Sequence, residues 1–92
     1  MKAMRDISSG AISGTGTLVC PSEIFGGAII NTDGTNAVTV TVRKTDASGD
    51  IVFQCTTKTT LPIFAPFQAE NPIYYAISGT GGTAELFEWY DG

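Results

Sequence analysis

The chain has 92 residues and a formal net charge of −4, from five basic and nine acidic side chains, and it contains no histidine. An acidic balance, with no basic run longer than two residues, argues against nucleic acid as a partner. Without histidine, general acid–base catalysis and a structural zinc site both lack their usual residue. We therefore expect no enzyme activity, no cofactor and no metal.

Residues 1–9 are predicted to form a flexible N-terminal arm, followed by a single domain over residues 10–92. Charged and small residues interrupt the apolar stretch that a signal peptide needs, and no run of about 18 apolar residues follows. We therefore expect folding in a cytosol, without a membrane partner. In that compartment Cys20 and Cys55 are most simply free, buried thiols, while a disulfide between them stays open as an alternative.

The first half of the chain alternates as β-strands do. A glycine-rich first strand is predicted from residue 11 to about residue 20, and the apolar run 24–31 follows, with a bulge or bend at Gly26–Gly27. Asp33–Gly34 then has the residue types of a tight turn. The next strand, 38–42, alternates valine with threonine, so we expect its valines to face a core and its threonines to face outward.

The second half continues the pattern. A turn over 46–50 leads to a strand over 50–57, and the segment 61–67 contains two prolines, which restrict it to an edge strand or a crossing loop. Further strands are predicted over 73–78 and 83–90. Six to eight short strands without a helix predict an all-β fold, a small antiparallel β-sandwich. Periodicity leaves both jelly-roll and immunoglobulin-like strand orders open.

Polar clusters in the chain have structural explanations. Asp33 and Asn36 could suggest calcium ligands, but the distal glutamate of an EF-hand loop is missing and a hairpin turn needs the same residues. Glu85 and Glu88 are an odd number of residues apart, so they do not share a strand face and do not form a catalytic carboxylate pair. The glycines of 79–82 precede no helix and include no lysine, which argues for a turn and against a phosphate-binding loop.

The nine aromatic residues are too many for all of them to point inward, because neighbours along a strand face opposite sides. Core packing is expected for three of them: Phe53, Phe87 and Trp89. The candidates for an interface are four others: Phe64, Phe67, Tyr74 and Tyr90.

From about residue 11 to residue 90 the chain resembles the small β-sandwich proteins that decorate or cement the capsids of tailed bacteriophages. The matching features are the segment Asn-Thr-Asp-Gly-Thr-Asn at 31–36, the valine–threonine strand at 38–42, the turn at 46–50, the proline-rich crossing and the glycine turn at 79–82. The resemblance implies a virion structural protein on the capsid surface, present in the host cytoplasm before assembly. It also implies binding to the major capsid protein, often as a homotrimer.

Two other functions stay open at this point. A phage tail, neck or fibre component differs from a decoration protein only in its partner. A carbohydrate-binding β-sandwich module would use Trp89, Tyr90 and Tyr74 as a stacking platform. For the decoration function, we expect the N-terminal arm to add a strand to a neighbour's sheet edge.

Overall fold

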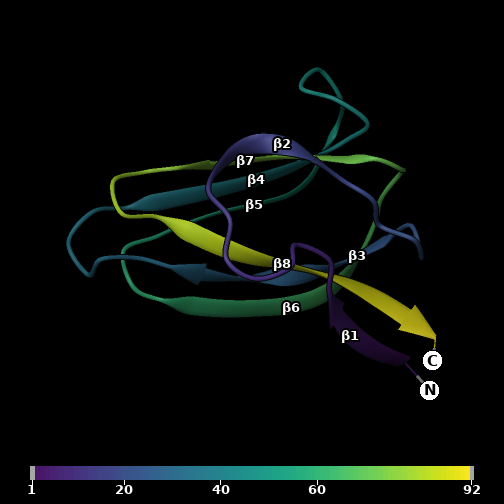
Figure 1. Cartoon of the computed structure of the whole chain (residues 1–92), viewed down its shortest axis with the longest axis horizontal. Coiled ribbons are helices and arrows are strands. Elements are labelled where there is room, and N and C mark those ends of the chain that lie inside the picture. The colour runs from purple at the N-terminus through teal and green to yellow at the C-terminus, as the bar shows by residue number, and fades with distance from the viewer. Residues whose placement is uncertain (1, 92) are drawn as a thin grey trace.

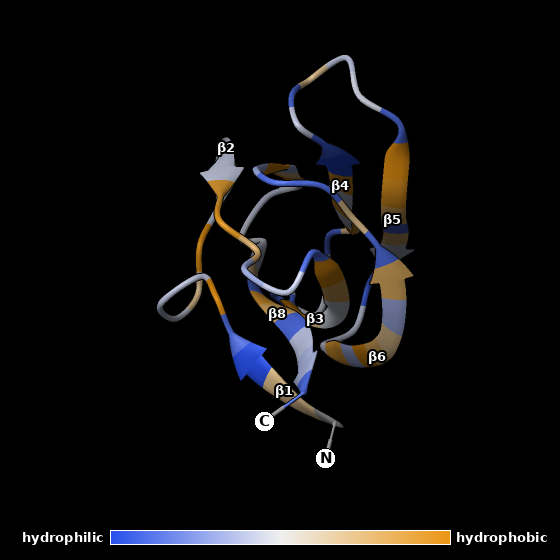
Figure 2. Ribbon diagram, turned by 90° about the vertical axis from the view of Figure 1, so that its right-hand side faces the viewer, coloured by the Kyte–Doolittle hydropathy of each residue, from blue (hydrophilic) through white to orange (hydrophobic). Residues whose placement is uncertain are grey.

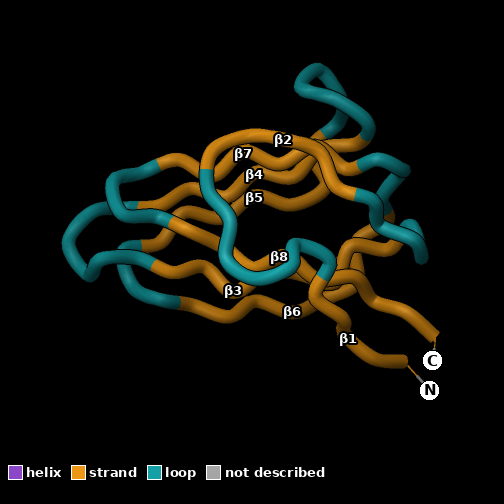
Figure 3. The backbone as a smooth tube through the Cα atoms, in the orientation of Figure 1, coloured by secondary structure: helices purple, strands orange, loops and turns teal. Residues whose placement is uncertain are grey.

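The alternating segments form eight β-strands in the computed structural model, which describes residues 2–91 (Figures 1 and 3). None of the described residues is helical, and so none forms a helix able to cross a membrane. The strands are β1 (Lys2–Asp6), β2 (Gly14–Leu18), β3 (Ile24–Asn31), β4 (Val38–Lys44), β5 (Ile51–Thr57), β6 (Leu61–Gln68), β7 (Ile73–Ser78) and β8 (Thr83–Asp91).

The strands make two four-stranded antiparallel sheets, with the orders β1-β8-β3-β6 and β2-β7-β4-β5. The first strand therefore pairs with the last, the second with the seventh, the third with the sixth and the fourth with the fifth. This pairing is that of a double-sheet jelly roll, in which a long hairpin is wound into a sandwich. The predicted all-β sandwich is confirmed, and the strand order selects the jelly roll over the immunoglobulin-like alternative.

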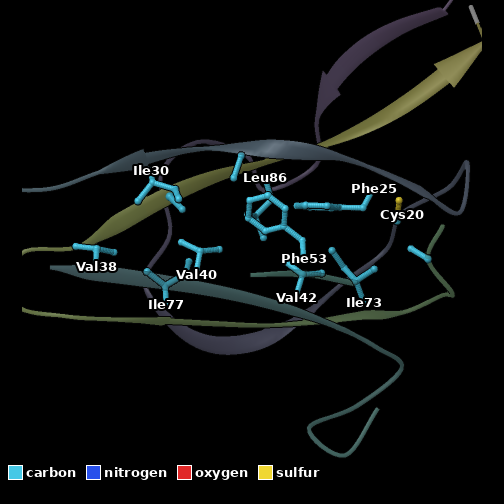
Figure 4. Close-up of a cluster of buried hydrophobic side chains, with 13 residues drawn as sticks. Cys20, Phe25, Ile30, Val38, Val40, Val42, Phe53, Ile73, Ile77 and Leu86 are labelled. Atoms are coloured by element: carbon cyan, nitrogen blue, oxygen red, sulfur yellow. The ribbon is translucent and has the colours of Figure 1, made fainter. Parts of the chain in front are cut away.

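The core lies between the two sheets, where buried apolar residues of β3, β4, β5, β7 and β8 meet (Figure 4). On β4 the three valines are fully buried, as the sequence pattern predicted, and threonines alternate with them. Three phenylalanines join the sheets: Phe53 of β5 lies 5.4 Å from Phe25 of β3 and 5.5 Å from Phe67 of β6, measured between ring centroids. Such contacts add roughly 0.5–1.5 kcal/mol each beyond the area that they bury.

The proline-containing segment is an edge strand, which was one of its two predicted forms. β6 is the last strand of its sheet and pairs only with β3. Pro62 and Pro66 are four residues apart, so their nitrogens lie on the same side of the strand, and the unpaired outer side needs no N–H group. Figure 2 shows bands of hydrophobic and hydrophilic residues along β6.

The beginning of the chain differs from the predicted arm. Residues 2–6 form β1, which pairs with residues 87–91 of β8, and residue 1 lies outside the described part. β1 and the last part of β8 leave the sandwich side by side as a two-stranded ribbon (Figures 1 and 4). The prediction was wrong because it looked for an apolar partner nearby in sequence, whereas the partner strand lies at the other end of the chain.

Candidate interaction surface

The two faces of β8 meet different surroundings. Leu86 and Glu88 are fully buried, so this side of the strand faces the interior of the sandwich. Phe87 and Trp89 have the opposite parity and are half-buried, which places them on the outer face of the sheet. The expected core packing of these two aromatic residues is therefore wrong, whereas Phe53 is buried as expected.

An apolar strip crosses this outer face from β1 to β6. Met4 of β1 is the cross-strand partner of Trp89, and on the other side of β8 the ring of Phe64 lies 5.3 Å from the ring of Phe87, edge to face. Phe64 is 46% exposed. We call these four residues, Met4, Phe64, Phe87 and Trp89, the apolar strip.

The glycine pair of β3 makes room for the strip. A Cβ added to Gly26 would lie 2.5 Å from Met4 Sδ, and one added to Gly27 would collide with the backbone oxygen of Ile63. Gly27 also has a φ of +112°, which residues with a side chain rarely adopt. The pairing register of β3 shifts here, as the predicted bulge at Gly26–Gly27 requires. Gly27 lies between Phe64 of β6 and Phe87 of β8, and because it has no side chain the two rings can meet across it.

An ion pair between the half-exposed Arg5 and the fully buried Glu88 holds the ribbon to the sandwich. Glu88 Oε2 accepts hydrogen bonds from Arg5 Nε at 2.7 Å and from Arg5 Nη2, while Glu88 Oε1 accepts one from the backbone N–H of Ser22 at 3.0 Å. The Arg5 guanidinium also lies 4.4 Å from the centroid of the Tyr90 ring. These contacts connect β1, β8 and the loop between β2 and β3, and they fix the strands that carry Met4 and Trp89.

The surroundings of Glu88 keep it ionised. Burial raises the pKa of Glu88, but the hydrogen bonds from Arg5 and Ser22, with the positive charge of Arg5, outweigh burial and lower the pKa below its ordinary value. The fully buried carboxylate is thus a charged anchor for the ribbon.

Two acidic residues lie beside the apolar strip. Asp6 is the cross-strand partner of Phe87, and Glu85 precedes Phe87 on the same face of β8. Burial raises the pKa of Asp6, but hydrogen bonds from Ser8 and Gly10 outweigh burial, so the pKa lies below its ordinary value. Glu85 has no ion-pair partner within residues 2–91. The apolar strip is thus flanked by negative charge.

The opposite outer face, on the sheet β2-β7-β4-β5, is polar. Thr39 and Thr41 lie there, as predicted, because the three valines of β4 point inward, although neighbouring side chains bury Thr41. Thr39 Oγ1 lies 2.7 Å from Thr56 Oγ1, and Gln54 Nε2 donates to Thr41 Oγ1 at 3.0 Å. Hydroxyl and amide groups satisfy one another across this face, so the two faces of the sandwich differ in chemistry.

The four residues predicted for an interface do not lie together. Phe64 belongs to the apolar strip, whereas Phe67 packs against the core. Tyr74 is on the outer face of the other sheet, paired with Thr17, and Tyr90 lies on the ribbon. The stacking platform of Trp89, Tyr90 and Tyr74 is therefore divided among three places.

Sequence reasoning missed Met4, Arg5 and Glu88. A signal for Glu88 is present, because it has the same parity as Ala84 and Leu86 in a strand with apolar alternate positions. A glutamate at such a position implies a buried carboxylate, which needs a cation or several N–H donors. Nothing near it in sequence identifies Arg5 as that cation.

The remaining polar candidates satisfy their own turns. Asp33 Oδ1 accepts the backbone N–H groups of Thr35 and Asn36 at 2.8 Å each, and Asp33 Oδ2 accepts Asn36 Nδ2 at 2.8 Å. These bonds, the one from the Asn36 backbone first, lower the pKa of Asp33. The described residues contain no group of three potential metal ligands and no detected pocket.

Both cysteines are free thiols. Cys20 is fully buried, and burial together with the negative charge of Glu88 raises its pKa, despite hydrogen bonds that act in the opposite direction. Cys55 is partly buried on β5.

Comparison of the chain with protein-family models, with curated proteins and with solved structures finds no match.

Proposed function

We propose that this protein is a virion structural protein that binds the outer surface of a tailed-phage capsid and stabilises or decorates it. The resemblance described above supports the class of partner, which is the major capsid protein. The observation that carries the mode of binding is the apolar strip on the outer face of β1-β8-β3-β6. A jelly roll by itself does not decide the function, because capsid proteins, lectins and cupins all use it.

Aromatic and methionine side chains are enriched in protein interfaces and are costly to leave in water. The strip lies on a regular sheet, with its ribbon end fixed by the Arg5–Glu88 pair, so a partner would meet a surface that is already ordered. Binding to such a surface loses little conformational entropy. These properties suit a protein that attaches to a large, rigid assembly.

The negative charge of this protein indicates which residues its binding site on the capsid contains. The strip is flanked by Asp6 and Glu85, and the whole chain has a net charge of −4. A complementary site on the capsid is apolar at its centre, with lysine or arginine at its rim. The homotrimer implied by the resemblance is part of this proposal.

The experiment compares loading of the wild-type protein, Phe64→Ser and Val19→Ser onto capsids that lack the protein. Phe64 and Val19 are both exposed, at 46% and 65%, but only Phe64 belongs to the strip. We expect Phe64→Ser to weaken binding roughly tenfold or more, as removal of a well-packed aromatic contact does, and Val19→Ser to bind as wild type. Equal occupancy by the two variants would refute binding through the strip, and binding to tails instead of shells would refute the capsid as partner.

A further inference from the structure

Met4 connects β1 to a strand with which β1 does not pair. β8 lies between β1 and β3 in the sheet, and Met4 is the cross-strand partner of Trp89 on β8. Its side chain nevertheless reaches β3, because a Cβ added to Gly26 would lie 2.5 Å from Met4 Sδ. The same Cβ would lie 2.8 Å from the backbone carbonyl carbon of Glu88 and 2.9 Å from the backbone nitrogen of Trp89. The sulfur of Met4 therefore lies close to the backbone of β8, where a side chain at Gly26 would otherwise be.

A thioether fits this place because it needs no hydrogen bond. Methionine sulfur is polarisable and packs well against rings and backbone. Met4 is half-buried, so solvent and small solutes reach part of its side chain. Oxidation would add an oxygen to the sulfur, and a sulfoxide oxygen needs a hydrogen-bond donor or water. An oxygen turned toward Gly26 would meet the same backbone atoms as the added Cβ, so the oxidised side chain has to turn away from β3.

We propose that Met4 is a site of reversible oxidation by hydroperoxides, and that its oxidation opens the ribbon and weakens the apolar strip. In the reaction with hydrogen peroxide, the sulfur attacks one oxygen, an S–O bond forms, the O–O bond breaks and water leaves. The sulfur loses two electrons and the peroxide gains them. The product places a polar group beside Trp89 and removes the contact between β1 and β3.

The ribbon is the part of the sandwich that is most sensitive to the loss of one contact. β1 is an edge strand of five residues and pairs only with β8. Two strands paired only with each other are at best marginally stable in water. The side chains of Arg5 and Met4 add contacts beyond this pairing, the first with Glu88 and the second with Gly26. Oxidation removes the second contact and leaves the first, so we expect the ribbon to open while the rest of the sandwich stays folded.

The experiment treats the purified protein with dilute hydrogen peroxide and measures the structure before and after. Mass spectrometry of peptides quantifies the sulfoxide at Met4. We expect the amide hydrogens of β1 to exchange roughly tenfold faster after oxidation, and those of β4, in the other sheet, to exchange at an unchanged rate. The midpoint of urea unfolding should fall by roughly 0.5–1 M. Treatment with methionine sulfoxide reductases should restore both values.

Met4→Leu is the matched control, because leucine keeps a similar apolar volume but has no sulfur to oxidise. Peroxide also reacts with the other methionine and with the thiols of Cys20 and Cys55, and these reactions still occur in the variant. We expect peroxide to leave the exchange of β1 in Met4→Leu unchanged. Equal exchange and equal urea midpoints in the oxidised and reduced wild-type protein would overturn the proposal. The same conclusion would follow if Met4→Leu changed as much as wild type, or if Met4 in the folded protein resisted peroxide that oxidises a free methionine peptide.

Loading onto capsids is a second measurement, and it alone rests on the proposed function. We expect the oxidised wild-type protein to bind capsids roughly tenfold more weakly than the reduced protein, and Met4 in loaded capsids to be protected from peroxide because the strip is covered. Reduced protein that does not load would refute the proposed function, while the exchange of β1 still decides the role of Met4. Equal loading of oxidised and reduced protein would overturn the effect of oxidation on the strip.

Discussion

Replacing Arg5 by alanine tests whether the Arg5–Glu88 ion pair anchors the β1–β8 ribbon. The change removes both side-chain donors to Glu88 Oε2 and leaves the fully buried carboxylate with the Ser22 N–H group. Leaving a buried charge without its partner costs about 3–5 kcal/mol, but the Arg5 side chain is 53% exposed, so water can partly replace it. Including the lost contact with the Tyr90 ring, we expect a loss of about 3 kcal/mol. Total stabilities are roughly 0.05–0.15 kcal/mol per residue, so the loss is a substantial fraction of the whole.

The same substitution has a characteristic pH dependence. In the wild-type protein the pKa of Glu88 is lowered, so its ionisation stabilises the fold above the unfolded-state pKa of about 4.3, and this contribution is lost as the pH falls through the folded-state pKa. Without Arg5, burial dominates and raises the pKa of Glu88, so protonation relieves the cost of the buried charge. The difference in unfolding free energy between variant and wild type is therefore largest near neutral pH and becomes smaller on acidification.

Urea unfolding at a series of pH values measures both effects. A loss of about 3 kcal/mol corresponds to a midpoint shift of roughly 1–3 M urea for a small protein. Arg43→Ala is the matched control: it also removes one arginine, but Arg43 makes a single hydrogen bond to the backbone oxygen of Gly49, worth about 1 kcal/mol. Adding Glu88→Gln to Arg5→Ala should recover stability at neutral pH. A loss no greater than that of Arg43→Ala, with no dependence on pH, would refute the anchoring role.

Two further predictions concern the backbone and the thiols. Gly27→Ala should destabilise the protein by more than about 3 kcal/mol, because the added Cβ would meet the backbone of β6. Gly34→Ala should cost about 1 kcal/mol, since Gly34 has a positive φ but open space around it. Thermal unfolding compares the two variants, and equal costs would contradict the close packing of β3 on β6. Iodoacetamide should modify Cys55 much faster than Cys20 in the folded protein, because Cys20 is fully buried and its pKa is raised. Mass spectrometry of the labelled chain shows the order, and faster labelling of Cys20 would contradict its burial.

Local chemistry was sufficient to predict much of the fold. Valines alternating with threonines over 38–42 correctly identified a strand and its inward face, because period-two alternation directly reflects the geometry of a strand. Asp33 and Gly34 identified a turn, and two prolines restricted the segment of β6 to an edge strand or a crossing loop, of which the structure has the first. In each of these cases the deciding interaction lies within a few residues of the chain.

The candidate surface could not be predicted in the same way. β1 depends on pairing with β8, and Arg5 is separated from Glu88 by 83 positions in the sequence. The outward position of Phe87 follows from the burial of Glu88, which runs against the usual preference for burying the aromatic residue. Long-range pairing decided these placements, and hydropathy along the chain does not encode it.

The central claim is that the outer face of β1-β8-β3-β6 binds a capsid. An electron cryo-microscopy map of the native assembly tests it most directly, because the map locates the chain and shows which face it turns to its neighbour. We predict that the protein lies on the outer surface of the shell with Phe64 and Trp89 covered by the major capsid protein. A map in which the apolar strip faces solvent, or in which the chain lies away from the shell, would contradict the claim.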